Sequence, residues 1–194
     1  MTAAAAHQSA ESDAAIIGRS VREPECFARV FDRYYDTIHG YVARRLGATL
    51  ADDLASETFL TAFARRDRYD VARADARPWL FGIASNLVAR HHRAEQRWYR
   101  ALARTGVDDV SEGHADRVAV RLDATARQSA LAAALAAVPT RDRDVLLLVA
   151  WAELTSEQAG QALGIPSGTA RSRLHRARRR MRDALERTER MTDA

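Results

Sequence analysis

Hydrophobic residues recur at helical spacing through most of the chain. Over 24–46 they follow the i, i+3, i+4, i+7 rule that places side chains on one helix face: Phe27, Val30, Phe31, Tyr34, Ile38, Tyr41 and Val42. The same spacing predicts helices over about 51–64, 78–100, 126–137, 141–152, 155–163 and 168–187. No strand pattern of any length accompanies them, so we predict an all-α fold.

Two segments lack this apolar spacing and divide the chain. Residues 1–20 are rich in alanine and serine, and we predict a disordered N-terminal tail there. Residues 104–125 are polar and acidic, which predicts a flexible linker. The expected organisation is therefore two small helical domains, 21–103 and 126–190, joined by that linker, with a helix-turn-helix in the second.

Composition excludes several classes of protein. The single cysteine, Cys26, rules out a disulfide framework and a cysteine-rich zinc site. No apolar run approaches the roughly 20 residues of a membrane span, and the first twenty residues lack a basic stretch before an apolar core. We therefore expect a cytoplasmic protein with no membrane insertion.

Motifs of enzyme active sites are also missing from the sequence. The histidines are scattered outside any HExxH frame, and neither a phosphate-binding glycine loop nor a G-x-S-x-G turn occurs. We expect no catalytic residues, no metal and no cofactor, and hence a protein that is not an enzyme.

Arginine is concentrated in two blocks of the chain. Residues 65–104 carry a net charge of +6 and residues 171–194 carry +5, within a total of +4. Two basic blocks separated by an acidic middle are typical of two contacts with one polyanion. The alternative is arginine on solvated helix faces, and the phase of each helix decides between the two.

The last two predicted helices have the spacing of a helix-turn-helix. Thr155 and Gln158 stand at capping-box spacing, and Gly164 precedes a long basic helix. On that helix one stripe must face the core: Ala170, Leu174, Ala177, Met181 and Leu185. The opposite side could enter a major groove, with flanking arginines near phosphates: Ser172, His175, Arg176 and Arg179, flanked by Arg171, Arg173, Arg178 and Arg180. A solvated C-terminal helix explains the arginines after 177 but not the capped turn.

A second polar line follows the predicted helix over 78–100, opposite its buried stripe. Its members fall on one side at spacings of three and four: Asn86, Arg90, Arg93, Arg97 and Arg100. An arginine-rich loop with an aromatic precedes it: Arg65, Arg66, Arg68, Tyr69, Arg73 and Arg77. Arginines mixed with aromatics suit an unpaired nucleic-acid strand, although an ordinary amphipathic helix is the alternative.

The helix over 51–64 is acidic on its polar side. Its outward residues are Asp52, Asp53, Ser56, Glu57 and Leu60. Phosphates would repel this face, so it predicts a protein partner. The alternative is that the first-turn acids only complement the helix dipole.

Three stretches together resemble a bacterial RNA polymerase sigma factor of the extracytoplasmic-function (ECF) class: DDLASETFLTAF, RPWLFGIASNLVARHHR and VPTRDRDVLLLVAWAELTSEQAGQALGIPSGTARSRLHRARRRM. The resemblance implies a first domain that recognises and helps to melt the promoter −10 element and a second that recognises the −35 element. It implies core RNA polymerase and promoter DNA as partners, together with an anti-sigma protein.

The resemblance also assigns residues. It implies that core polymerase is bound by Asp52, Asp53, Ser56, Glu57 and Leu60. The −10 element falls to Arg65, Arg66, Arg77, Trp79, Asn86, Arg90, Arg93 and Arg97, and the −35 element to Thr169, Arg171, Ser172, Arg173, His175, Arg176 and Arg179.

Departures from the family pattern and two competing functions remain. The family usually has Glu-Ile-Ala where this chain has Gln158-Ala159-Gly160, and valine where it has Ala170. The two smaller residues and the interior glycine, which alone should cost about 1 kcal/mol, predict a loosely packed second domain. A stand-alone helix-turn-helix regulator would explain only 140–187. A helical adaptor that binds no DNA would explain neither basic face.

Overall fold

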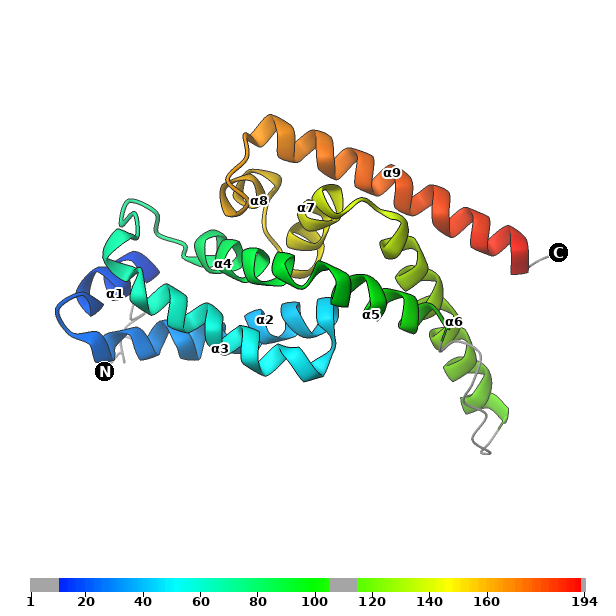
Figure 1. Cartoon of the computed structure of the whole chain (residues 1–194), viewed down its shortest axis with the longest axis horizontal. Coiled ribbons are helices and arrows are strands. Elements are labelled where there is room, and N and C mark those ends of the chain that lie inside the picture. Colours follow the sequence, from blue (N-terminus) through cyan, green and yellow to red (C-terminus); the bar gives the residue numbers. More distant parts are fainter. Residues whose placement is uncertain (1–10, 105–114, 193–194) are drawn as a thin grey trace, which may run out of the picture.

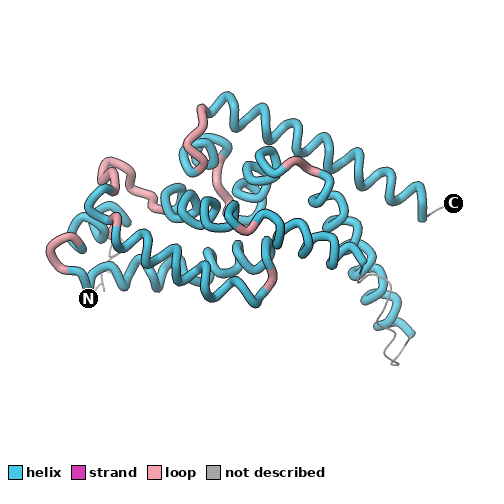
Figure 2. Tube along the Cα trace, in the orientation of Figure 1, coloured by secondary structure: helices cyan, strands magenta, loops and turns pink. Residues whose placement is uncertain are grey.

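The computed structural model describes residues 11–104 and 115–192, and every regular element within them is a helix (Figures 1 and 2). The helices are α1 (Asp13–Ser20), α2 (Ala28–Leu46), α3 (Ala48–Ala64), α4 (Arg77–Arg90), α5 (His92–Arg104), α6 (Ala115–Ala137), α7 (Thr140–Trp151), α8 (Ser156–Ala162) and α9 (Ser167–Thr192), with 3-10 turns η1 (Pro24–Phe27) and η2 (Arg66–Arg68). The all-α prediction is confirmed. None of the described helices is long and apolar enough to cross a membrane.

The helices form two packed groups along one axis (Figure 1). α2 and α3 pair as a hairpin against α4, around fully buried side chains such as Ile38, Tyr41 and Leu80. α7 and α8 pack on α9 around Val145, Leu148 and other residues. α4 and α5 lie between the α2–α3 pair and the α7–α9 group, so the two groups are in direct contact.

The prediction of a disordered tail is wrong for residues 11–20, which the structure describes. Ser12 caps α1 by accepting a hydrogen bond from the Ala15 N–H, and Ile16 and Ile17 are fully buried. A helix of two turns is too short for apolar spacing to reveal it, and tertiary packing supplies its stability. Residues 1–10 of the predicted tail lie outside the described residues.

The single helix predicted over 78–100 is in fact two. The chain turns at His91, and α5 then directs Glu95 and Tyr99 into the interior. The polar line is therefore divided, because Asn86 and Arg90 lie on α4 whereas the later arginines lie on α5. The buried carboxylate of Glu95 accepts hydrogen bonds from Arg45 of α2 and Arg143 of α7, which holds α5 in place after the turn.

The predicted linker is shorter than the sequence pattern indicated. α6 begins at Ala115 rather than near residue 126, and residues 105–114 lie outside the described part of the chain. Alanine and arginine are good helix formers even where no apolar stripe occurs, which is why periodicity missed this segment. α6 lies alongside α5, where the Ser129 hydroxyl donates to the Ala103 carbonyl at 2.7 Å.

The loose packing expected in the second group is not seen where α8 meets α9. A Cβ at Gly160 would lie 3.0 Å from the Ile165 carbonyl oxygen and 3.4 Å from the Ala170 Cβ. Gly160 and Ala170 are both buried, and their small size lets the two helices approach this closely. The small residues at 160 and 170, which both depart from the family pattern, therefore pack closely against each other.

Candidate nucleic-acid interface

The start of α8 has the capping box that the sequence predicted. The Gln158 N–H donates to the Thr155 hydroxyl at 3.1 Å, and the Gln158 side chain accepts from the Thr155 N–H at 2.9 Å, which completes a capping box. Ala170, Leu174 and Ala177 face the core. The phase predicted for α9 is therefore confirmed for these three positions.

This phase leaves the basic side of α9 free. Among the residues predicted to contact the −35 element, Thr169 and Arg173 are half-buried. The others are exposed along one side of the helix: Arg171, Ser172, His175, Arg176 and Arg179. A helix that presents exposed arginines, a serine and a histidine in its first turns can contact base edges and phosphates.

One of these arginines has an intramolecular partner that the sequence did not reveal. The Arg176 guanidinium donates to both carboxylate oxygens of Asp142 on α7, at 3.0 and 3.2 Å. Asp142 is almost fully buried, whereas Arg176 remains exposed. The pair joins α7 to α9 and fixes the direction in which the guanidinium points. No spacing rule links residues 34 positions apart, so only the fold could identify Asp142.

A preformed loop leads into α4 and carries aromatic residues. The rings of Tyr69 and Trp79 lie 4.9 Å apart, and the Tyr69 hydroxyl donates to the Arg73 carbonyl at 2.5 Å. Burial, with nearby carboxylates, raises the pKa of Tyr69 to about 12, so the phenol remains a donor at neutral pH. Trp79 is thereby held half-buried beside the arginines of this loop.

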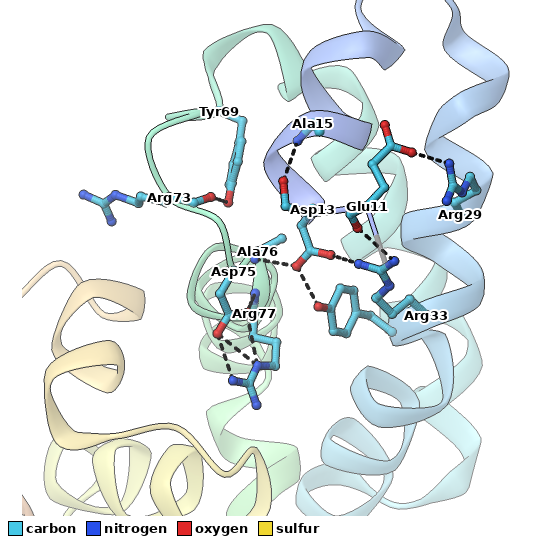
Figure 3. A network of polar contacts seen from close by, with 12 residues as sticks. Glu11, Asp13, Ala15, Arg29, Arg33, Tyr69, Arg73, Asp75, Ala76 and Arg77 are labelled. Atoms are coloured by element: carbon cyan, nitrogen blue, oxygen red, sulfur yellow. Dashed lines mark hydrogen bonds and ion pairs between the residues drawn. The ribbon is translucent and has the colours of Figure 1, made fainter. Parts of the chain in front are cut away.

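Asp13 of α1 ties this loop to the helices beneath it (Figure 3). Its buried carboxylate accepts from the Ala76 N–H at 2.8 Å and the Tyr34 hydroxyl at 2.6 Å, and it pairs with Arg33 of α2. Ala76 immediately precedes α4, so α1 fixes the point where α4 begins. Sequence reasoning missed Asp13 because it fell within the predicted tail.

The structure separates the residues predicted for the −10 element into three sets. Arg65, Trp79 and Asn86 line one cavity of about 240 Å³ beside α4, and Arg90, Arg93 and Arg97 are exposed farther along the chain. Arg66 instead donates to the Ser20 and Phe63 carbonyls, and Arg77 pairs with Asp75 at 2.8 Å. Burial opposes ionisation of Asp75, yet the hydrogen bonds from Arg77 lower the pKa of this carboxyl. Arg66 and Arg77 are therefore engaged in contacts within the protein that stabilise the loop before α4.

The acidic face of α3 is exposed as the helical phase predicted. Asp52, Asp53, Ser56 and Glu57 are exposed, and Leu60 beside them is 69% exposed. Leu54, Ala55 and Phe59 occupy the inner side. The exposed carboxylates of this face would repel phosphates, so the face does not suit nucleic acid. No cluster of three metal-ligating side chains forms within residues 11–104 and 115–192.

Comparison with known proteins accounts for both helical groups. Residues 30–98 match the family Sigma-70 region 2, and residues 128–181 match Sigma-70, region 4. The ECF RNA polymerase sigma factor SigW of Bacillus subtilis is 31% identical over 175 residues, covering 84% of this chain and 90% of SigW. The chain belongs to the ECF sigma factors. SigC of Mycobacterium tuberculosis is a further relative, 35% identical over 128 residues that make up 66% of each protein.

Two solved structures share the fold of this sigma factor. CnrH, in complex with the cytosolic domain of CnrY, is 20% identical with a TM-score of 0.61, covering 90% of this chain and 97% of CnrH. RpoE of Bartonella quintana, in complex with the anti-sigma factor NepR, is 22% identical with a TM-score of 0.57, covering 82% and 96%.

Membership of the family establishes the function. The sigma factor binds core RNA polymerase and directs transcription initiation at specific promoters. The match to region 2 accounts for residues that a stand-alone helix-turn-helix regulator would leave without a purpose, so that alternative is not favoured.

Proposed function

We propose that three surfaces of this sigma factor make separate contacts during transcription initiation. The loop before α4, with α4 and the start of α5, contacts the −10 element. The N-terminal half of α9 contacts the −35 element, and the exposed face of α3 contacts core polymerase. The observation that supports this division is the helical phase, because in α3 and α9 the apolar side is buried while most of the predicted contact residues are exposed.

The same proposal assigns the domains. Residues 21–103, together with α1, form the unit that binds the polymerase and the −10 element, and residues 126–190 form the unit that binds the −35 element. The sigma factor contributes recognition and strand separation, and the polymerase supplies the catalysis, in the cytoplasm where the two proteins meet.

An anti-sigma protein completes the set of partners that we propose. Two structurally similar proteins were solved in complex with another chain, the cytosolic domain of CnrY in one case and the anti-sigma factor NepR in the other. Since this chain shares their fold, a protein of that kind would have comparable helical surfaces to bind.

The test of the proposed function is reconstitution with purified core RNA polymerase on sheared genomic DNA. We expect a stoichiometric complex and transcripts whose upstream sequences share two elements at a fixed spacing. Core polymerase alone is the control. Transcripts that start at the same positions without the sigma factor, or that share only one element, would contradict the proposal.

Base reading and phosphate anchoring on α9 should be separable by two matched arginine variants. We expect Arg176→Ala in the holoenzyme to change the preferred base at one −35 position, because a lost base contact costs about 1–3 kcal/mol at that position alone. Arg180→Ala removes the same charge farther along the helix and should weaken all sequences equally. Selection from a pool with randomised −35 positions measures both preferences.

The selection needs one further control, because Arg176 is paired with Asp142 in the structure. Removing Arg176 leaves the Asp142 carboxylate without the partner seen in the structure, and that carboxylate would repel phosphate. The double variant Arg176→Ala, Asp142→Asn removes the repulsion and should keep the altered preference. A wild-type preference in both the single and the double variant would show that Arg176 reads no base.

A further inference from the structure

An apolar hollow lies between α5 and α6 and reaches the C-terminal ends of α2 and α7. Its volume is about 410 Å³, and small-molecule pockets commonly enclose about 300–1,000 Å³. The wall is mainly aromatic and aliphatic, with Trp98 and Leu102 from α5, Leu131 and Leu135 from α6, and Trp151 from α7. Leu131 is 43% exposed, so the hollow is open to solutes.

Local contacts fix two walls of this hollow. Gly47, between α2 and α3, has a φ of 86°, and a Cβ there would lie 3.1 Å from the Trp98 ring. Glycine therefore allows both the turn and the close packing of the indole against it. The Ser129 hydroxyl of α6 donates to the Ala103 carbonyl of α5 at 2.7 Å, which holds the two helices side by side (Figure 1). The hollow is thus built on packed helices.

The charge at this hollow is positive. Among the described residues that line it, Arg44 of α2 alone is charged. The Arg44 guanidinium lies 5.8 Å from the centroid of the Trp151 ring, and it forms no ion pair within the part of the chain that the structure describes. Arg44 is exposed, so its N–H donors are available to an anion. A carboxylate can accept two of these donors at once.

The same wall contains buried donors that lack an acceptor. Trp98 Nε1 and the Tyr99 hydroxyl are buried, and neither has a hydrogen-bond partner among residues 11–104 and 115–192. Buried polar atoms are nearly always paired in folded proteins, either with protein atoms or with water. An indole N–H can only donate, so it favours a ligand that carries acceptor oxygens.

We propose that this hollow binds an amphipathic carboxylate, a small molecule of the medium-chain fatty acid type. The apolar chain lies among Trp98, Leu102, Leu131 and Trp151, and the carboxylate pairs with Arg44. A cationic amphiphile would find no acidic partner in this wall, and a neutral one would leave Arg44 without a partner. None of these residues belongs to the surfaces proposed for promoter DNA or core polymerase, so the site is an additional binding activity of the sigma factor.

The probe is decanoate, titrated below its micelle concentration into the full-length Trp79→Phe protein. Trp79 lies outside the hollow, and the other two tryptophans of the chain, Trp98 and Trp151, both line it. We expect a saturable change in tryptophan emission and an unfolding temperature that rises with decanoate concentration. Decanol and decyltrimethylammonium have the same apolar chain and should bind at least roughly tenfold more weakly, since neither pairs with Arg44.

Two matched pairs of variants locate the site. Arg44→Gln should weaken decanoate binding roughly tenfold and leave decanol binding unchanged, whereas Arg22→Gln removes an exposed arginine elsewhere and should change neither. Ala48→Trp adds a large ring at an exposed position of the wall and should abolish decanoate binding. Thr49→Trp, at the next exposed position and outside the wall, is its control. Circular dichroism confirms the helix content of each variant.

Each alternative outcome overturns a stated part of the proposal. Wild-type affinity for decanoate in Ala48→Trp would place the binding elsewhere and remove the site. Equal affinities for decanoate and decanol, or for decanoate in the wild-type and Arg44→Gln proteins, would remove the role of the carboxylate. The absence of saturable decanoate binding would overturn the whole inference. The three surfaces of the proposed function would stand in every case, because reconstitution with core polymerase tests them separately.

Discussion

Reversing the acidic face of α3 should abolish the complex with core RNA polymerase. In the triple variant Asp52→Arg, Asp53→Arg, Glu57→Arg we expect the dissociation constant to rise by at least ~100-fold, or about 2.7 kcal/mol. Three favourable charge pairs would become like-charge contacts across a protein interface. All three side chains are exposed, so the helix should fold unchanged. Fluorescence anisotropy with labelled sigma factor measures the affinity.

The control for this triple variant keeps the total charge change. Glu25, Asp32 and Asp36 are exposed acids outside α3, and their reversal to arginine alters the net charge by the same amount. We expect this protein to bind core polymerase within about threefold of the wild type, because these acids lie outside the proposed contact face and exposed charges are screened by salt. Equal loss of binding in both triple variants would assign the effect to net charge and remove the role of α3.

Strand opening should depend on the polar residues of α4 and α5. With Asn86→Ala, Arg90→Ala and Arg93→Ala combined, we expect a normal footprint over the −35 element and permanganate reactivity of the melted thymines reduced by at least about tenfold. The proposed contacts of these three residues to an unpaired strand form only after the strands separate, so their loss should affect opening and leave binding of the duplex intact. All three are exposed in the structure.

A double arginine variant provides the comparison for strand opening. Arg22 and Arg104 are exposed and lie outside the proposed −10 surface, so Arg22→Ala with Arg104→Ala removes the same two charges. Permanganate reactivity should remain at the wild-type level in that protein. Full reactivity in the triple variant would show that the polar residues at 86, 90 and 93 are only a solvated face.

The phase of long helices was predictable from the sequence, and pairs distant in the chain were not. The buried stripe through Ala170, Leu174 and Ala177 followed from helical spacing alone, since α9 presents this spacing over several turns. The exposed acids of α3 followed in the same way. Glu95, in contrast, looked like an ordinary charged residue of an amphipathic helix, because its partners Arg45 and Arg143 lie about fifty positions away.

Short elements and changes of direction escaped prediction for a related reason. α1 has eight residues, too few for periodicity to stand out, and its carboxylate Asp13 contacts residues twenty and more positions later. The turn at His91 carries neither proline nor glycine, so no local signal separates α4 from α5. In each case tertiary packing and buried polar contacts determine the structure and override local preference.

The central claim is that two separate surfaces of one sigma factor read two elements of one promoter. Its most direct test is site-specific photocrosslinking in the holoenzyme–promoter complex, with benzoylphenylalanine replacing Asn86 in one protein and Arg179 in another. We expect the crosslink from position 86 to map to an unpaired strand at the −10 element and the crosslink from position 179 to map to the −35 element. Crosslinks from both positions at the same element, or from position 86 to duplex DNA upstream, would contradict the claim.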